Sequence, residues 1–163
     1  MTTASGVREP ATKPAPTTAY TSDEAVREAL ARYLTAVAEQ LRGIGHRVSG
    51  PTLAPPGERL AGTLTAPAAN GDANPGVVVA SWNEETGWST RRDRPHQPTS
   101  TRRYLHQRLL PAPTLAAQFI AAATHRGGGA PAAVGLAVAD HPMQFRYRTG
   151  RAEQLLTQLT HAG

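Results

Sequence analysis

The sequence predicts a small α+β domain, in which an antiparallel sheet of about four to six strands is packed by two main helices, with a short C-terminal helix. Three patterns favour this class. Residues 75–91 read as a β-hairpin that carries both tryptophans, residues 22–42 show the periodicity of an amphipathic helix, and prolines 111 and 113 introduce a second helix. Hydrophobic residues make up 39% of the 163 residues, alongside 15 glycines and 14 prolines, so we expect one modest core with long irregular connections.

The first predicted element is the helix at residues 22–42. Residues 1–20 before it have almost no large apolar side chain and are expected to form a disordered tail. Thr21 and Glu24 make a capping-box pattern at the start of the helix, and Gly43 supplies the stop. Its apolar stripe belongs either to the core of this domain or to a face for a partner helix. The stripe consists of Val26, Ala29, Leu30, Tyr33, Leu34, Val37, Ala38 and Leu41.

The next predicted strand covers residues 58–65, where Leu60, Gly62 and Leu64 alternate with more polar neighbours. Residues 43–57 before it read as a short extended piece and a loop. Residues 66–76 after it are rich in Ala, Asn, Pro and Gly, a composition typical of a connection at the surface.

In the hairpin, a run of β-branched residues from Val77 leads to Trp82, and a polar tip of five residues, 83–87, leads to Trp88. The two indoles are expected to lie near one another across the strand pair, where aromatic pairs contribute about 0.5 to 1.5 kcal/mol beyond their burial. We interpret them as core residues. The alternative interpretation is a stacking platform for a base or a sugar.

The remaining elements follow the hairpin. Residues 92–100 are polar, contain two prolines and predict a mobile loop, and residues 101–105 predict a strand. The second helix has an apolar stripe of Leu115, Phe119, Ile120 and Ala123 and is expected to end at the glycines 127–129. Residues 133–138 and 144–148 predict two further strands. The short final helix is marked by Ala152, Leu155, Leu156 and Leu159.

These elements predict one domain at residues 21–126 and a basic extension at residues 127–163 that packs on it. The sequence contains no cysteine, which excludes disulfides, thiolate zinc sites and a cysteine nucleophile. The first residues lack the apolar region of a signal peptide, and no apolar run is long enough to span a bilayer. We therefore expect a soluble protein of the cytosol.

The net charge of +5 is unevenly placed, since residues 86–163 hold ten arginines and only three acidic residues. Arginine suits recognition of phosphate or carboxylate because its guanidinium is a planar fork of donors. A GC-rich genome, which favours arginine codons, is the alternative source of this bias.

Three segments together resemble a known family. They are the helical YLTAVAEQL at residues 33–41, the WNEETGW core at residues 82–88, and LLPAP at residues 109–113 leading to Ala117 and Phe119. Over about residues 22–123 the chain resembles the actinobacterial domain of unknown function 6292 family. The resemblance implies no activity that can be assigned to a residue.

No catalytic, cofactor or metal site is predicted. The six histidines show no pair at the i,i+4 spacing of a helical metal site, and no serine lies in a G-x-S-x-G elbow. Glu84 and Glu85 are adjacent at the predicted hairpin tip, where water is expected to keep both near their normal acidity. We therefore expect a protein that is not an enzyme.

The basic stretch is the strongest positive signal. If its arginines converge on one face, they would attract a polyanion. The other interpretation, which the sequence favours, is that the arginines are scattered over the surface and solvated. Our leading hypothesis is a small non-catalytic module that binds another protein through the exposed hairpin and the basic extension. The alternative is an accessory nucleic-acid-binding protein that also uses Arg146, Arg148 and Arg151. The candidate polyanion-binding residues are Arg91, Arg92, Arg94, Arg102, Arg103 and Arg108.

Overall fold

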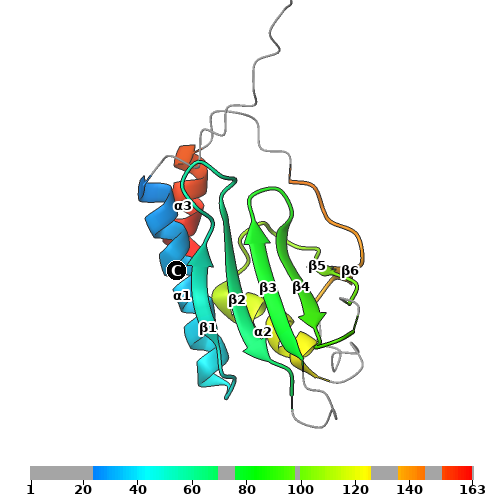
Figure 1. Ribbon diagram of the computed structural model, residues 1–163. Helices are drawn as coiled ribbons and strands as arrows, with labels where there is room; N and C mark the ends of the chain where they lie inside the picture. Colours follow the sequence, from blue (N-terminus) through cyan, green and yellow to red (C-terminus); the bar gives the residue numbers. More distant parts are fainter. Residues whose placement is uncertain (1–23, 70–75, 98–99, 126–135, 146–151, 163) are drawn as a thin grey trace, which may run out of the picture.

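The computed structural model describes residues 24–69, 76–97, 100–125, 136–145 and 152–162 (Figure 1). Six strands form one antiparallel sheet in chain order, so each strand lies beside its neighbours in sequence. The predicted α+β class is confirmed. The strands are β1 (Ser49–Leu53), β2 (Ala61–Pro67), β3 (Val77–Asn83), β4 (Gly87–Asp93), β5 (Arg103–Leu105) and β6 (Val138–Ala139). The helices are α1 (Glu24–Gly43), α2 (Pro113–Thr124) and α3 (Ala152–Ala162).

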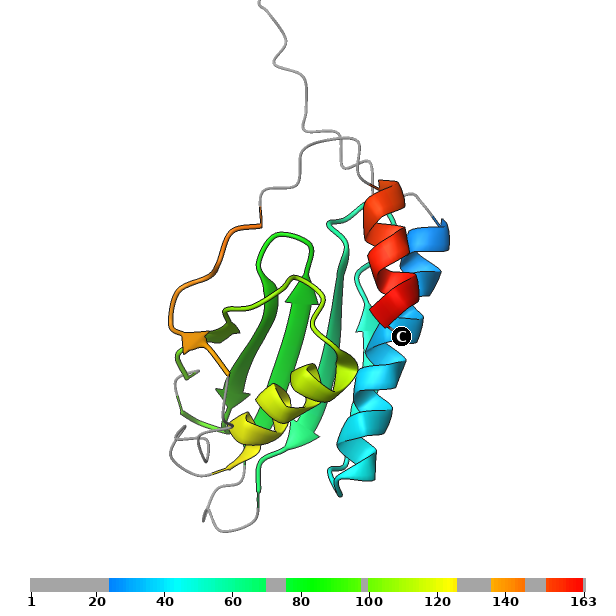
Figure 2. The ribbon, with the colours of Figure 1, turned by 180° about the vertical axis from the view of Figure 1, so that it is seen from behind.

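The helices lie on one face of the sheet. Figure 2 shows α1 and α2 crossing this face and α3 lying against α1. None of the three described helices lies on the other face. Because side chains alternate along a strand, the strands bury one set of residues under the helices and leave the other set on the open face. On the helix side the sheet contributes Leu64, Val78, Ala80, Trp82 and Trp88 to the core.

Helix α1 supplies much of the core through the predicted stripe, all eight residues of which are buried. The core interpretation of that stripe is therefore confirmed. α1 also approaches the sheet closely at Gly62 of β2, where an added Cβ atom would overlap the side chain of Leu34. A glycine is required there because the helix and the strand leave no room for a methyl group.

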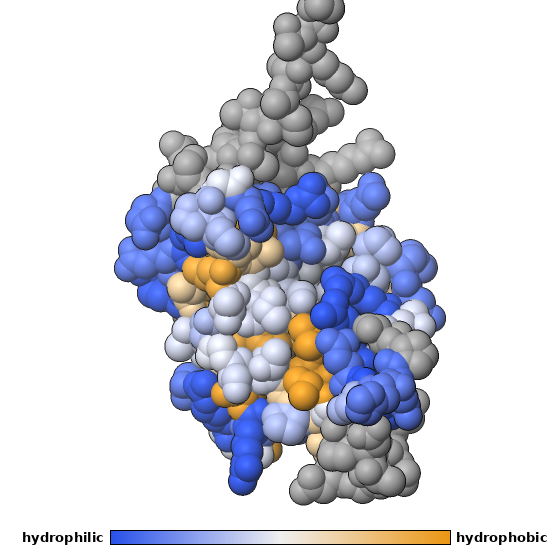
Figure 3. All heavy atoms as spheres, in the orientation of Figure 1, coloured by the Kyte–Doolittle hydropathy of each residue, from blue (hydrophilic) through white to orange (hydrophobic). Residues whose placement is uncertain are grey.

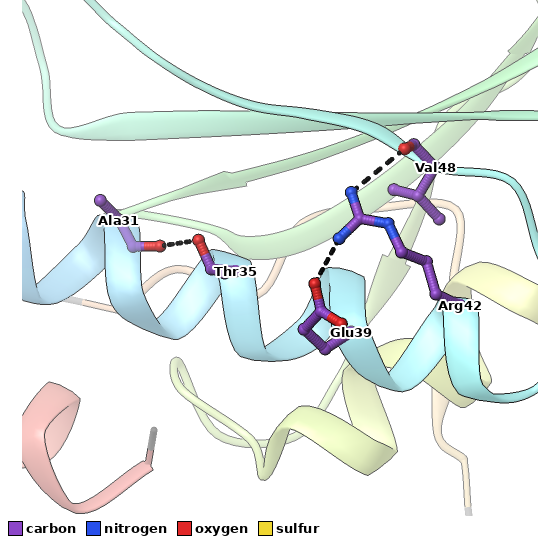
Figure 4. Close-up of polar contacts among 5 residues, drawn as sticks. All are labelled: Ala31, Thr35, Glu39, Arg42 and Val48. Atoms are coloured by element: carbon purple, nitrogen blue, oxygen red, sulfur yellow. Dashed lines mark hydrogen bonds and ion pairs between the residues drawn. The ribbon is translucent and has the colours of Figure 1, made fainter.

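The C-terminal end of α1 is tied to the chain that follows it (Figure 4). Arg42 pairs with Glu39 one turn earlier and donates a 3.3 Å hydrogen bond to the carbonyl oxygen of Val48, just before β1. Within the helix, the Thr35 hydroxyl donates to the carbonyl oxygen of Ala31 at 2.8 Å. These contacts fix the direction in which the chain leaves α1. The predicted helix at residues 22–42 agrees with α1, although residues 22 and 23 lie outside the described part.

The hairpin of β3 and β4 places Trp82 directly opposite Trp88. Its tip is shorter than predicted, since Asn83 pairs with Gly87 and three residues connect the strands. The Asn83 side chain explains the tight turn: its Oδ1 atom accepts hydrogen bonds from the backbone N–H groups of Glu85 and Thr86 at 3.0 and 2.9 Å. Gly87 has a φ of 67°, a conformation that favours glycine.

Three expectations need correction. Arg92 and Asp93 continue β4 instead of opening a loop. In α2 the buried small residues Ala116, Ala117 and Thr124 replace the predicted Leu115 and Ala123, because α2 packs closely against α1 and the sheet. Gln144 and Phe145 are not in a strand, although the Phe145 N–H donates a 2.7 Å hydrogen bond to the carbonyl oxygen of Glu85. Residues 133–135, 146–148 and 127–129, and the predicted tail at residues 1–20, lie outside the described residues.

Two described parts of the predicted C-terminal extension contact the rest of the fold. β6 pairs with β5 at the edge of the sheet, and α3 buries Leu155 and Leu159 in the same core as α1. In the part of the chain that the structure describes, no helix combines the length and the apolar character needed to cross a membrane.

Candidate functional site

The two indoles fix the segment that precedes α2. The indole nitrogen of Trp82 donates a 2.8 Å hydrogen bond to the carbonyl oxygen of Leu109. The indole nitrogen of Trp88 donates a 3.0 Å bond to the hydroxyl oxygen of Tyr33, which donates in turn to the carbonyl oxygen of Pro111 at 2.8 Å. Both indole side chains are buried, so their core interpretation is confirmed and the stacking platform is wrong.

The Tyr33 hydroxyl is the centre of this network. Burial raises the pKa of Tyr33 because the charged form would lie away from water, while the hydrogen bond from Trp88 acts in the opposite direction. The hydroxyl therefore keeps its proton and remains available as a donor to Pro111. A buried polar chain of this kind is stable only when each member has its partner.

A groove of about 890 Å³ opens beside the segment that the indoles hold. It lies between residues 107–113 and the C-terminal half of α3, which Figure 2 shows next to the start of α2. Its residues come from three separate parts of the chain, so no local sequence pattern predicts it. The described residues of the lining are Gln107, Arg108, Leu109, Leu110, Ala112, Pro113, Phe145, Gln158 and His161.

The described lining of the groove combines apolar and polar side chains. Leu109 and Leu110 are largely buried, at 3% and 9% exposure, and belong to the main core, while Phe145 packs against that core as a half-buried ring. Arg108 and Gln158 are exposed. Such a combination of an apolar surface with a few polar groups is typical of binding sites.

Phe145 is held over the hairpin tip. Its N–H donates to the Glu85 carbonyl oxygen, and its ring lies so close to Gly87 that an added Cβ there would be 3.3 Å from the ring. The hairpin therefore supports the groove at two places. Its indoles hold the backbone at Leu109 directly and at Pro111 through Tyr33, and its tip contacts Phe145.

The candidate arginines of β4 point to opposite faces of the sheet. The Nη2 atom of Arg92, on the helix side, donates to the carbonyl oxygens of Ala123, Thr124 and His125 at 3.1, 2.9 and 2.8 Å. These are carbonyls at the end of α2, where a cation is favoured by the helix dipole. Arg91, on the open face, pairs with Asp93 at 3.1 Å. The structure thus gives Arg92 a structural role in the fold.

The other candidate arginines are also spread out. Arg94 donates to the Gln97 side chain at 3.3 Å, and Arg103 pairs with Asp140 at 3.5 Å. Arg108 lines the groove, whereas Arg102 is half-buried just before β5. The structure therefore does not bring all six candidate arginines to one face. Arg146, Arg148 and Arg151 lie outside the described residues.

Glu84 at the hairpin tip departs from the expectation of a carboxyl group of normal acidity. Glu84 is half-buried, and this burial raises its pKa, while a backbone hydrogen bond from Leu60 and the charge of Arg59 act in the opposite direction. Glu85 forms an exposed ion pair with Arg59 at 2.7 Å. The error arose because sequence alone does not show that the turn packs its first glutamate beside Leu60.

Two pairs of histidines meet in the fold despite their separation in sequence. The rings of His46 and His125 have centroids 6.3 Å apart, and those of His106 and His141 are 4.9 Å apart. Desolvation lowers the pKa of His46, and the nearby His125 lowers it further. Among the residues described, no three His, Asp or Glu side chains gather in a way that could hold a metal ion.

The open face of the sheet is a second surface to consider. The register places Thr63, Thr65, Val79 and Ser81 on it, and Figure 3 shows this face with weakly polar and a few apolar side chains in its centre and hydrophilic ones around them. This face is not the groove side, so substitutions on it serve as controls for the groove.

Comparison with known families bears on the same segments. Residues 33–122 match a family described as a family of unknown function, DUF6292. The chain belongs to this family. The DUF6292 match begins at Tyr33 and includes the hairpin and residues 107–113, but it ends before Phe145 and α3, the other wall of the groove. The predicted resemblance is confirmed, with a later start than expected. No curated protein and no solved structure matches the chain.

Proposed function

We propose that the protein is a non-catalytic binding module that holds a segment of another protein in the groove between residues 107–113 and α3. The observation that carries this proposal is the groove itself, an open site of about 890 Å³ whose lining joins buried core residues with the half-buried Pro113 and Phe145. Grooves of this kind accept the apolar side chains of a partner, and rigid walls reduce the entropy lost on binding.

The walls of the groove are well supported. Two indole hydrogen bonds and the Tyr33 hydroxyl hold the backbone at Leu109 and Pro111, so this wall is fixed before a partner arrives. α3 is anchored by Leu155 and Leu159, which leaves Gln158 exposed toward the groove.

The proposal assigns no reaction to the protein. Among the described residues, the groups with shifted pKa values are Tyr33 in the core, His46 after α1 and Glu84 at the hairpin tip, and they belong to different parts of the fold. General acid-base chemistry needs such groups close together around one substrate atom. A location in the cytosol is part of the proposal, because a chain without cysteine suits a reducing compartment.

Nucleic-acid binding through the arginines is the alternative. The contacts of Arg92 with the end of α2, and the pairing of Arg91 and Arg103 with aspartates, reduce the free positive charge that this alternative needs. We therefore favour the protein partner and treat nucleic acid as an outcome of the test.

The proposal is tested by affinity capture from the native host, with nuclease treatment before elution. Three baits are compared: the wild-type chain, Ala112→Trp, which fills the groove, and Ala61→Trp, which makes the same change on the open face. We expect the wild-type bait to capture a partner protein whose recovery does not depend on nucleic acid. The Ala112→Trp bait should fail to capture this partner, and the Ala61→Trp bait should still capture it. Recovery of nucleic acid alone, or a partner indifferent to Ala112→Trp, would contradict the proposal.

A further inference from the structure

We propose that the groove takes an acidic segment of the partner, in which an apolar side chain is followed or preceded by a carboxylate. This inference rests on the proposed function and deepens it by naming the chemistry of the segment. It follows from the charge and the polarity of the groove lining.

The lining is electrostatically one-sided. Its described residues include an arginine and a histidine, Arg108 and His161, and no acidic residue is among them. A carboxylate entering the groove meets no like charge, whereas a lysine would approach Arg108 without an acidic partner. Charge complementarity of this kind selects a partner more than it adds raw affinity.

Arg108 differs from Arg91 and Arg103 of the basic stretch. Arg91 pairs with Asp93, and Arg103 pairs with Asp140. Arg108 is exposed, and within the described part of the chain no carboxylate pairs with it. Its guanidinium is therefore free to form the two parallel hydrogen bonds that an arginine makes with a carboxylate.

The apolar anchor follows from two lining residues that keep part of their surface exposed. Pro113 and Phe145 are half-buried, and they lie in the same groove lining as Arg108 and the buried Leu109 and Leu110. Covering their exposed surface with a leucine or phenylalanine side chain removes apolar area from water, which is the main favourable term in most associations. Arg108 then restricts where a carboxylate can lie on the same segment. The apolar lining and Arg108 together therefore select a short motif that contains an apolar side chain and a carboxylate.

Fluorescence anisotropy with three labelled peptides tests this inference. Each peptide carries the core Leu-Phe-Leu, flanked on both sides by Glu, by Gln or by Lys. We expect the wild-type chain to bind the Glu peptide about tenfold tighter than the Gln peptide, as a charge-assisted contact would give. The Lys peptide is expected to bind more weakly than both.

Two variants and one control locate the effect. Arg108→Gln should remove the preference for the Glu peptide and leave the affinity for the Gln peptide unchanged. Ala112→Trp should weaken both peptides, and Arg102→Gln, the same change outside the groove, should change neither. Arg108 and Ala112 are both exposed, so far-ultraviolet circular dichroism is expected to show wild-type folding for each variant.

Several outcomes would overturn the inference. Equal binding of the Glu and Gln peptides would refute the role of charge, while the capture experiment would still decide the proposed function separately. Failure of every peptide to bind would refute the motif. If a mixed-sequence DNA duplex displaces the Glu peptide, and Arg102→Gln weakens binding as much as Arg108→Gln, the site is a diffuse polyanion surface and the inference is wrong.

Discussion

The indole nitrogen of Trp88 donates a 3.0 Å hydrogen bond to the hydroxyl oxygen of Tyr33, across a separation of 55 residues. This bond joins the hairpin to α1, and the next bond in the chain joins α1 to Pro111. Three parts of the family match thus meet at one buried hydroxyl. The wall of the groove depends on this meeting point.

Replacing Tyr33 by Phe is expected to destabilise the fold by about 1–3 kcal/mol, because the Trp88 N–H and the Pro111 carbonyl both lose a buried partner. Urea unfolding measures the change. The control is Tyr104→Phe, at the half-exposed tyrosine on the open face, which should lower the free energy of unfolding by less than about 0.5 kcal/mol. Equal effects for the two variants would show that the buried network contributes nothing.

Replacing Arg92 by Ala is expected to lower the free energy of unfolding by about 1–2 kcal/mol, since carbonyls at the end of α2 lose a charged donor. Amide hydrogen exchange in the last turn of α2 should become faster. Arg91→Ala is the matched control one residue earlier and removes a half-exposed pair with Asp93, so it should cost about 0.5 kcal/mol, less than Arg92→Ala. A larger effect for Arg91→Ala would contradict the assignment.

The sequence predicts the elements of this fold well because their signals are local. The stripe of α1 and the apolar run of β3 each have the period of the structure they form, so position and burial both follow. For α2 the sequence predicts the helix, but it predicts the buried residues only in part. Ala116 and Ala117 are buried in the core, whereas the larger Leu115, which is expected there, is not. How closely two elements approach depends on the whole fold, and no window of sequence contains that information.

Replacing Gly62 by Ala is expected to cost about 1–3 kcal/mol, because the new methyl group would overlap the side chain of Leu34 and force α1 away from β2. Thermal and urea unfolding both report the loss. Gly43→Ala is the control at the end of α1, where no atom lies within 4 Å of an added Cβ. It should be neutral or slightly stabilising, since alanine favours the helix. A stable Gly62→Ala variant would refute the close approach.

Glu84→Gln is expected to become more stable relative to the wild type as pH rises. The pKa of Glu84 is raised in the folded state, so the folded chain holds this proton more tightly than the unfolded chain does. Its contribution is therefore most favourable below the ordinary carboxyl pKa and is lost as pH increases through the raised value. The Gln variant has no charge to desolvate and avoids this loss.

Melting temperatures of the wild type and Glu84→Gln between about pH 4 and pH 7 test this prediction. The difference between them should grow in favour of the variant with increasing pH. Glu85→Gln controls for removal of a charge at the same tip. It breaks the exposed pair with Arg59 and removes the like charge that adds to the raised pKa of Glu84, but leaves Glu84 buried, so its stability should change less with pH than that of Glu84→Gln. A difference that stays constant with pH would show that burial of Glu84 has no effect on its acidity.

The candidate site was less predictable than the fold. The groove is lined by Arg108, Pro113, Phe145 and Gln158, and their spacing in the sequence does not predict that they lie close together. It forms only once α3 packs on α1. The arginine stretch predicted a basic surface from composition alone. The structure does not gather these arginines on one surface, because successive side chains of a strand point to opposite faces, and this separates Arg91 from Arg92.

Site-specific photo-crosslinking in native-host extract tests the central claim, that the groove is where this protein meets its partner. A benzophenone side chain is placed at Ala112 or Gln158 in the groove and at Thr63 on the open face. We predict that one partner protein crosslinks from both groove positions and not from the open face. Crosslinks from Thr63 alone, with none from the groove, would contradict the account.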